Sequence, residues 1–573
     1  MSLRRTLHTF IAMVLALGAS SHAALGQDAG TPLTPTQQFA AEVDLSPLDR
    51  VAVQWEGRVK SFYSLAHETV GRIVGPRGLP HESHAFVYLD LMLRPSAYAD
   101  APLIYVKNKS MRSQIGQTLV NANVVDEAWR ENFIKRGQIS RTLLMRDDVQ
   151  AQMEVFRRDL IRTAKFVNQI DFALYLAQPS ELMNRMRVLP PQDATSADLW
   201  MSIETLMNRP VMEELTGVPI QPELRNQLQT HWGRLMLAWG QMDAQTVNAE
   251  LEAFVDLLPQ IAPDVYPETR RLEAESWYFK YGSMTWGWLI YLLASMFLLM
   301  SVAYRWNKAR WIGLGIFGVA FGVHTAALLM RWWISGRWPN SNMFEAVTTA
   351  VWFGAVVALL LEFVARRSAM RNLFALTAAC ASMAALMAAR YLPQLDPNIS
   401  NMMPILHDIW LYIHTNVIIA SYAVIAMASV TGILYIIWRM FGGSPDYARV
   451  GGAAVLFERG SRGMDVESRR VSPGEVFDGA TMILLELAVV MLWAGLIMGA
   501  IWADHSWGRP WGWDPKEVFA LNTFIIFLIL VHIRLKVKDK GMWTAVLAIL
   551  GCGVMLFNWI VINFIITGLH SYA

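Results

Sequence analysis

Three histidines lie where an apolar run meets a polar break, and their imidazoles are able to bind a metal. His414 stands near the start of one run, in WLYIHTNVIIASY, and His570 follows the last run, in GLHSYA. Two imidazoles at one depth can bind a metal from both sides, the axial arrangement that haem iron accepts. His532, in LILVHIRLKVK, lies near the opposite end of another run. His414 or His570 alone is explained about as well by a hydrogen bond to a carbonyl at a helix end. A polar residue within a span is usually functional, which favours His532, although its place near the inner interface weakens that argument.

The stretch WGRPWGWDPKE, residues 507–517, places three tryptophans in one short polar break. Trp507, Trp511 and Trp513 offer flat faces on which a porphyrin can stack. Arg509 and Lys516 can meet its propionates through charge-assisted hydrogen bonds. Any one of these tryptophans also fits the aromatic belt of a membrane interface. The ordered set W-G-x-x-W-x-W-D-x-x-E favours a loop that binds a macrocycle.

Two acidic residues and a fourth histidine have competing explanations. Asp514 and Glu517 can orient the loop, or they can cap the helix that follows, since acidic groups favour helix N-termini. His324 lies about 20 Å by helix rise from the inner end of its run, whereas His532 lies about 5 Å from the inner end of its own. Two ligands of one iron need nearly equal depth. We therefore expect His324 to be a hydrogen-bonding core residue and only a weaker candidate ligand.

The composition indicates an integral membrane protein. Of the 573 residues, 54% are hydrophobic, and the formal net charge of +2 gives no reason to expect nucleic acid as a partner;. The two cysteines, Cys380 and Cys552, both lie inside apolar runs, and the sequence contains no C-x-x-C pair. The chain therefore carries no thiol relay of its own.

Eight apolar segments are each long enough to cross a membrane, which takes about 20 residues of helix. We expect spans at 284–304, 311–331, 343–365, 372–390, 411–438, 477–502, 516–535 and 543–566. Basic residues concentrate in every second connection, at 305–310, 366–371, 439–476 and 536–540. The positive-inside rule puts these connections in the cytoplasm. The tryptophan-rich loop, 503–517, and the C-terminus are then expected on the outer side of the plasma (inner) membrane of a bacterium.

The chain before the spans has the features of an exported domain. Residues 1–26 contain two arginines, a short apolar core and the sequence Ser-His-Ala, which is typical of a secretory signal peptide;. An uncleaved anchor helix is the alternative, and the shortness of the apolar core favours cleavage. Residues 27–281 have no membrane-length run and show helical periodicity. The predicted fold is all-α, with about eight spans over 284–573 and a mostly helical exported N-terminal domain.

These stretches together resemble the tryptophan-rich "WWD" family of haem-handling proteins in cytochrome c maturation. Within it, residues 284–573 are most similar to CcsA, the haem-channel half of the System II cytochrome c synthase. The resemblance rests on RWWISGRWPNSNMFEA at 331–346, W-L-Y-I-H-T, WGWDPKE leading into LVHIR, and INFIITGLHSYA. It implies that His414 and His570 are the outer haem ligands and that His532 binds an inner, transmembrane haem. In that family a CcsB (ResB) half supplies the second inner ligand, so a separate CcsB-like membrane partner is implied.

The resemblance also implies a function in cytochrome c biogenesis. Haem b, both substrate and bound ligand, would cross the membrane and be presented on the outer face to the CxxCH motif of an apocytochrome c. Thiols of that motif would form thioether bonds with the haem. The chain would be a subunit of a holocytochrome c synthase that acts mainly by positioning, so no separate catalytic residue is assigned. An external thiol-reducing system and membrane lipid complete the expected partners.

Three other interpretations remain open. A haem chaperone of the CcmC or CcmF type, from the other maturation system, passes haem to a carrier or synthase. The exported domain and the GLHSYA end argue against it. A non-catalytic haem-binding membrane assembly factor would yield no thioether product. A transporter of another solute leaves the pair His414 and His570 unexplained.

Overall fold

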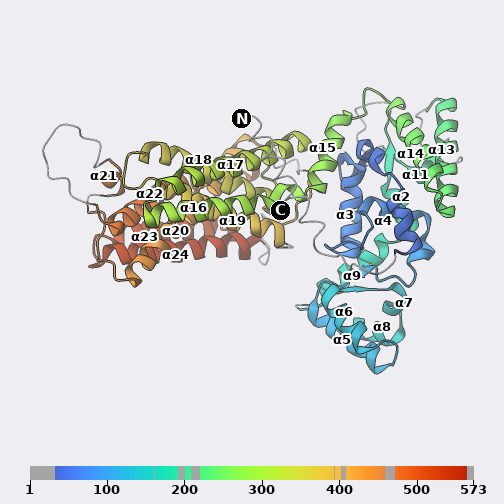
Figure 1. The fold of residues 1–573 in the computed structure, drawn as a ribbon, viewed down its shortest axis with the longest axis horizontal. Helices are drawn as coiled ribbons and strands as arrows, with labels where there is room; N and C mark the ends of the chain where they lie inside the picture. The colour runs from blue at the N-terminus through green and yellow to red at the C-terminus, as the bar shows by residue number, and fades with distance from the viewer. Residues whose placement is uncertain are drawn as a thin grey trace. The chain divides into compact units, whose positions relative to one another are not determined.

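The computed structural model describes residues 33–160, 162–191, 200–207, 220–392, 394–401, 408–449, 451–457 and 471–563. The chain divides into two compact units, Met1–Tyr281 and Gly282–Ala573. Helices dominate both units (Figure 1), which confirms the predicted all-α class. The signal peptide predicted at 1–26 lies outside the described residues.

The first unit is built from short helices and, within its described residues, three small antiparallel sheets of two strands. The helices are α2 (Pro35–Glu42), α3 (Phe62–Val74), α4 (His84–Leu93), α5 (Lys109–Asn121), α6 (Glu127–Arg136), α7 (Arg141–Leu144), α8 (Asp147–Arg158), α9 (Ala164–Leu176), α10 (Pro179–Arg185), α11 (Ile203–Met207), α13 (Pro222–Gln241), α14 (Ala244–Leu257) and α15 (Thr269–Lys280). The strand pairs are β1 (Ala52–Trp55) with β2 (Arg58–Ser61), β3 (Ile104–Tyr105) with β4 (Gln138–Ile139), and β5 (Arg187–Leu189) with β6 (Met201–Ser202).

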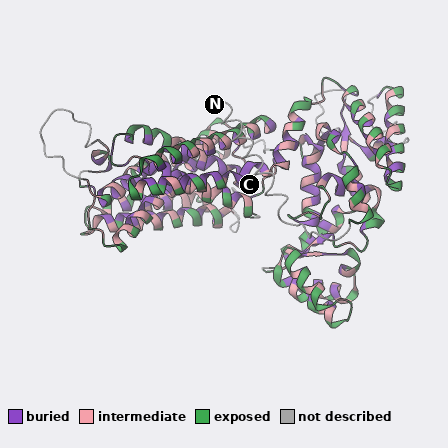
Figure 2. Cartoon of the chain, in the orientation of Figure 1, coloured by how far each residue is buried: buried purple, intermediate pink, exposed green. Residues whose placement is uncertain are grey.

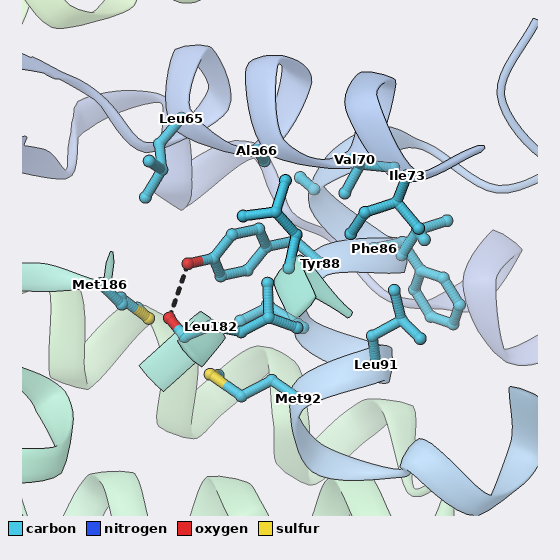
Figure 3. Close-up of a cluster of buried hydrophobic side chains, with 14 of the residues drawn as sticks. Leu65, Ala66, Val70, Ile73, Phe86, Tyr88, Leu91, Met92, Leu182 and Met186 are labelled. Carbon is cyan, nitrogen blue, oxygen red and sulfur yellow. Dashed lines mark hydrogen bonds between the residues drawn. The ribbon is translucent and has the colours of Figure 1, made fainter. Parts of the chain in front are cut away.

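One apolar core holds the first unit together, with α3 and α4 near its centre. Figure 3 shows Leu65 and Val70 of α3 on the side of that helix that faces Tyr88 of α4. The buried Tyr88 hydroxyl donates a hydrogen bond of 2.7 Å to the carbonyl oxygen of Leu182 in α10. An unmade hydrogen bond at a buried group costs about 1–3 kcal/mol. This bond therefore helps to fix α10 against the core.

Two acidic side chains of the first unit are shielded from water, Glu68 almost fully and Glu82 in part. Lys60 and Glu68 form an ion pair of 2.7 Å, and both side chains are buried. Burial raises the pKa of Glu68, because the charged form is harder to hold away from water;. Burial also raises the pKa of Glu82 to about 6, although the Tyr98 hydroxyl donates a hydrogen bond of 3.0 Å to its carboxylate. The stability of this unit should therefore depend on pH.

The second unit contains, among its described residues, eight helices that are long and apolar enough to cross a membrane. They are α16 (Trp288–Tyr304, preceded by η4, Gly282–Gly287), α17 (Asn307–Ser335), α18 (Met343–Ala365), α19 (Leu373–Tyr391), α20 (Ile409–Met440), α22 (Pro473–Trp507), α23 (Pro515–Ile533) and α24 (Lys540–Phe557, followed by the π-turn η6, Asn558–Ile562). The short helix α21 (Gly452–Phe457) precedes α22. This count confirms the predicted polytopic helical bundle.

The ends of α22 differ from the prediction, because capping residues extend the helix beyond its apolar run. Ser472 and Glu475 form a capping box at its start, four residues before the predicted span at 477–502;. Gly508, with a φ of +68°, ends the helix in the left-handed region;. Residues 503–507, which we predicted as part of a loop, are therefore helical. The polar break between α22 and α23 is confined to residues 508–514.

Burial is uneven among the helices of the second unit. In the most apolar stretch of each helix, 61% of the residues of α20 are buried but only 17% of those of α23. Figure 2 shows exposed residues along the outer surfaces of these helices, and large apolar side chains such as Trp311 and Leu360 are among them. Exposed apolar side chains on membrane-length helices suit a lipid environment. The helix α20 thus lies at the centre of the unit and α23 at its periphery.

An ion pair fastens the end of α23 to its neighbours. The guanidinium of Arg534 donates two hydrogen bonds of 2.6 Å to the carboxylate of Asp478 in α22. It also donates to the hydroxyl of Thr544 in α24, at 2.7 Å, and to the carbonyl oxygen of Ala448, at 2.9 Å. Bidentate pairs of this kind are stronger than single hydrogen bonds. Arg534 therefore joins three segments at one end of the bundle.

Candidate functional site

His414 lies in the second turn of α20 and is held by a carbonyl group of α22. The helix begins after Asp408, whose side chain accepts hydrogen bonds from the N–H groups of Trp410 and Leu411, at 2.7 and 3.3 Å. His414 Nδ1 lies 2.7 Å from the carbonyl oxygen of Gly495. Because a carbonyl oxygen only accepts, Nδ1 must carry the proton, and the neutral ring has its lone pair on Nε2. Metal-binding histidines usually show this pattern, in which the other nitrogen donates to a carbonyl or carboxylate.

His414 forms part of the wall of a cavity of about 270 Å³. This volume is close to the lower end of the range of about 300–1,000 Å³ for small-molecule sites. The walls come from the loop before α18, the first half of α20, the end of α22, the loop between α22 and α23, the start of α23, and η6 with the residue after it. Their polar and aromatic members are Asn340, Ser341, Tyr412, His414, Thr415, Tyr422, Trp502, Trp511, Lys516, Glu517, Asn558, Trp559 and Asn563. The structure thus brings His414 and the tryptophan-rich stretch to one cavity.

The three predicted tryptophans occupy different positions. Trp511 lines the cavity, whereas the ring of Trp507 packs against Trp502, with centroids 5.0 Å apart. Trp502 is itself a wall of the cavity. Trp513 is 73% exposed and has a φ of +57°, and its ring meets that of Trp511 edge-on at 6.0 Å. Trp511 is the member of the set that lines the cavity, and the stacking of a porphyrin on Trp507, Trp511 and Trp513 stays a prediction.

Asp514 and Glu517 form the cap of α23. The Asp514 carboxylate accepts the N–H of Lys516 at 3.1 Å, and Asp514 is buried. The Glu517 carboxylate accepts the N–H groups of Gly512 and Asp514, at 2.8 and 3.2 Å. This capping box satisfies backbone groups that a helix start leaves without partners. The capping role considered for these residues is therefore present, and it also fixes the loop that carries Trp511.

The two cations of the stretch also differ in position. Lys516 lines the cavity. Arg509 is exposed, and its guanidinium lies over Gly512, where a Cβ atom would be 3.2 Å from Arg509 Cζ. Both residues were predicted to bind an anionic group, and the position of Lys516 in the cavity wall fits that role better than the exposed position of Arg509. Arg509 remains a predicted cofactor-binding residue.

A buried ion cluster positions the loop before α18. Glu345 is fully buried and accepts hydrogen bonds of 2.8 Å from Arg331 and from Arg337. The N–H of Ser341 also donates to Glu345, at 2.8 Å. From this loop, Asn340 Nδ2 donates to the hydroxyl of Thr415 at 3.0 Å. The cluster therefore holds the loop against the turn of α20 that carries His414.

The remaining predicted histidines are not among the residues that line the cavity, and one of them lies outside the residues that the structure describes. His532 is exposed on α23, and its Nδ1 donates to the Leu528 carbonyl oxygen of the same helix at 2.7 Å. His324 is buried in α17, with Nδ1 3.4 Å from the hydroxyl of Tyr291. This contact agrees with the expected core hydrogen-bonding role. His570 lies outside the described residues.

Several cavity residues were not singled out by the sequence. Asn558 is buried in the π-turn η6, and its Nδ2 donates to the Tyr422 hydroxyl at 3.2 Å. Gly499 and Asn563 also line the cavity. Polar residues inside an apolar run are expensive in a membrane and usually functional. Asn558 and Asn563 are such polar residues near the end of the last span, so the sequence alone could have indicated them. Gly499 has no feature in the sequence that distinguishes it from the other glycines of the span.

The fold and the site define a polytopic helical membrane protein with an imidazole and tryptophans around a cavity. The family model of cytochrome C assembly proteins matches residues 340–570, which include this site. The cytochrome c biogenesis protein CcsA of Parasynechococcus marenigrum is 30% identical over 262 residues, covering 44% of this chain and 82% of that protein. CcsA of Prochlorococcus marinus is 31% identical over 258 residues, covering 44% of this chain and 81% of that protein. The chain belongs to the cytochrome c assembly protein family and is a relative of the CcsA proteins.

A further relative covers more of the chain. Protein NrfI of Wolinella succinogenes is 24% identical in an alignment of 545 residues that covers 90% of this chain. The chain spans only 53% of the length of NrfI. Most of the first unit therefore lies within the similarity to NrfI, whereas the similarity to each of the two CcsA proteins above covers 44% of the chain.

Proposed function

We propose that this protein moves haem b across the membrane and presents it at the His414 cavity for attachment to an apocytochrome c. The proposal rests on the position and tautomer of His414. Its Nδ1 donates a hydrogen bond to the Gly495 carbonyl oxygen, and its ring forms part of the cavity wall. An imidazole with its lone pair on Nε2 is able to bind iron. Membership of the cytochrome c assembly family supports this assignment.

The cavity residues then have distinct roles toward the bound haem. His414 would be one axial ligand, and His570, at the end of the chain, the second. Trp511 and Trp559 offer flat faces, and Lys516 offers a cation for a propionate;. The thiols of a CxxCH motif then add across the haem vinyl groups. A sulfur–carbon bond forms at one vinyl carbon and the thiol hydrogen goes to the other, so the addition consumes no oxidant or reductant.

We further propose that a CcsB-like membrane partner completes an inner haem site. His532 is exposed on α23, so a second protein has access to the haem that this imidazole would bind. The basic connections at 305–310, 366–371, 439–476 and 536–540 support placing this end of the bundle in the cytoplasm;. The His414 cavity and the first unit would then lie on the outer side of a bacterial plasma membrane. An external system would keep the apocytochrome thiols reduced.

The test is a visible spectrum of the full chain purified from membranes with a CcsB-like partner. We expect a reduced bis-histidine haem b spectrum that weakens in His414→Ala and in His570→Ala and returns with added imidazole. Co-expression with an apocytochrome c should give haem that stays bound to the cytochrome under denaturing conditions. Haem-free protein in every preparation would refute the ligand assignment. Bound haem without any thioether product would instead favour a CcmC- or CcmF-type chaperone or a non-catalytic assembly factor.

A further inference from the structure

Two glycines of α22 form the surface against which the ring of His414 lies. The carbonyl oxygen of Gly495 accepts the 2.7 Å hydrogen bond from His414 Nδ1. One turn further along α22, a Cβ atom on Gly499 would lie 2.6 Å from His414 Cε1 and 2.9 Å from Nδ1. Non-bonded carbon atoms prefer about 3.5–4.0 Å. The imidazole therefore occupies the space that any other side chain at position 499 would need.

The same two glycines set the distance between α20 and α22. A Cβ atom on Gly495 would lie 2.4 Å from Cδ1 of Ile418, one turn after His414 on α20. His414 therefore faces Gly499, and Ile418 faces Gly495, in two successive turns of an antiparallel helix pair. Small residues four positions apart allow membrane helices to approach closely. Here the close approach brings a backbone carbonyl within hydrogen-bonding distance of a ring nitrogen.

We propose that Gly495 and Gly499 are positioning residues that fix the tautomer and the direction of the His414 imidazole. The Gly495 carbonyl keeps the proton on Nδ1, which leaves the lone pair on Nε2. The missing side chain of Gly499, which also lines the cavity, leaves room for the ring in that orientation. This inference rests on the proposed function, in which His414 binds haem. Groups that orient a metal-binding histidine typically change affinity about 10–100-fold.

The first test measures haem affinity of the full chain by titration. We expect Gly499→Ala to bind haem about 10–100-fold more weakly than the wild type. Adding Gly499→Ala to His414→Ala should cause no further loss, because both changes act through one ring. Independent, additive losses would overturn the proposal, as would wild-type affinity in Gly499→Ala.

Two matched controls come from α24. Gly551→Ala introduces a comparable clash away from the cavity, since its Cβ atom would lie 2.5 Å from Phe527 Cζ. A Cβ atom on Gly553 would have no neighbouring atom within 4 Å, so Gly553→Ala controls for the effect of a glycine-to-alanine change without a clash. We expect both variants to bind haem as the wild type does. If Gly551→Ala loses as much affinity as Gly499→Ala, the loss reflects general damage to the bundle and the proposal is wrong.

A second readout needs no haem. The sequence contains 12 histidines, so the difference between nitrogen NMR spectra of ¹⁵N-histidine-labelled wild type and His414→Ala isolates the ring of His414. In haem-depleted membranes we expect a protonated Nδ1 and an unprotonated Nε2, and a shifted or mixed signal in Gly499→Ala. A proton on Nε2 in the wild type, or an unchanged signal in the variant, would overturn the proposal. Normal haem binding in His414→Ala would refute the proposed function instead, while the tautomer measurement still tests the glycines.

Discussion

Removing the carboxylate of Glu345 should destabilise the second unit strongly. Glu345 and Arg331 are 0% and 2% exposed, and Arg337 is 9% exposed at its side chain. The carboxylate accepts hydrogen bonds from both guanidiniums and from the N–H and hydroxyl of Ser341. Glu345→Ala would leave two arginines without their shared counter-ion in a region away from water. Breaking a buried ion pair in this way costs about 3–5 kcal/mol.

A graded series separates the charge from the hydrogen bonds. Glu345→Gln keeps one acceptor oxygen, so we expect a smaller loss than in Glu345→Ala. Charge-assisted hydrogen bonds contribute about 1.5–3 kcal/mol each, against about 1 kcal/mol for neutral ones. Adding Arg337→Gln to Glu345→Gln removes one unpaired cation and should recover part of the stability. Glu486→Gln, at an exposed position of α22, is the matched control and should change little.

The assay is equilibrium unfolding of the purified protein in mixed micelles, with the free energy of unfolding compared between variants. Asn340 and Ser341 line the cavity and depend on this cluster, so the destabilised variants should also bind haem less tightly. A loss below about 0.5 kcal/mol in Glu345→Ala, which is the size expected of an ordinary surface change, would refute the reasoning. Additive effects of Glu345→Gln and Arg337→Gln would show that the two groups do not share one charge cluster.

Two further predictions concern the loop and the first unit. Asp514→Ala removes the cap of α23 and should cost about 1 kcal/mol, and Asp514→Asn should restore most of it, as measured by unfolding;. Because the loop carries Trp511, haem affinity should fall in the alanine variant, and unchanged affinity would argue against a role for the cap in the site. Glu82 has a pKa of about 6 against an ordinary value of 4.5, so the folded unit binds its proton more tightly than the unfolded chain. The free energy of unfolding should therefore fall as pH rises from about 4.5 through 6, by at most about 2 kcal/mol. Hydrogen exchange of the amides of α4 measures this free energy, and its pH dependence over that range should disappear in Glu82→Gln.

The sequence predicted the spans well because length and apolar composition are local properties. The errors lie at the helix ends, where a few polar residues decide. Ser472 and Glu475 extend α22 backward, and Gly508 ends it at Trp507 within the predicted loop. These capping residues lie outside the apolar run, so the limits of the run do not mark the ends of the helix.

The candidate site was only partly predictable, for a different reason. His414 could be found from its position at the edge of an apolar run. Its hydrogen-bond partner, Gly495, lies 81 residues away, and only the packing of two helices brings them together. Trp513 is exposed and adopts a left-handed backbone conformation that its residue type does not favour;. Pairings across the bundle and unusual backbone angles are both invisible to periodicity.

Polar contacts hold the helix α23 at both of its ends. Asp514 and Glu517 secure one end, and Arg534, just after the other end, is bound to Asp478 and Thr544. Between these supports only 17% of its most apolar stretch is buried. The buried side chains of α23 are Thr523, Phe527 and Leu530, whereas α20 buries many more, so displacing α23 sideways would disturb less packing than displacing α20. We therefore expect α23, rather than α20, to be the helix whose displacement opens the bundle at the least cost in packing.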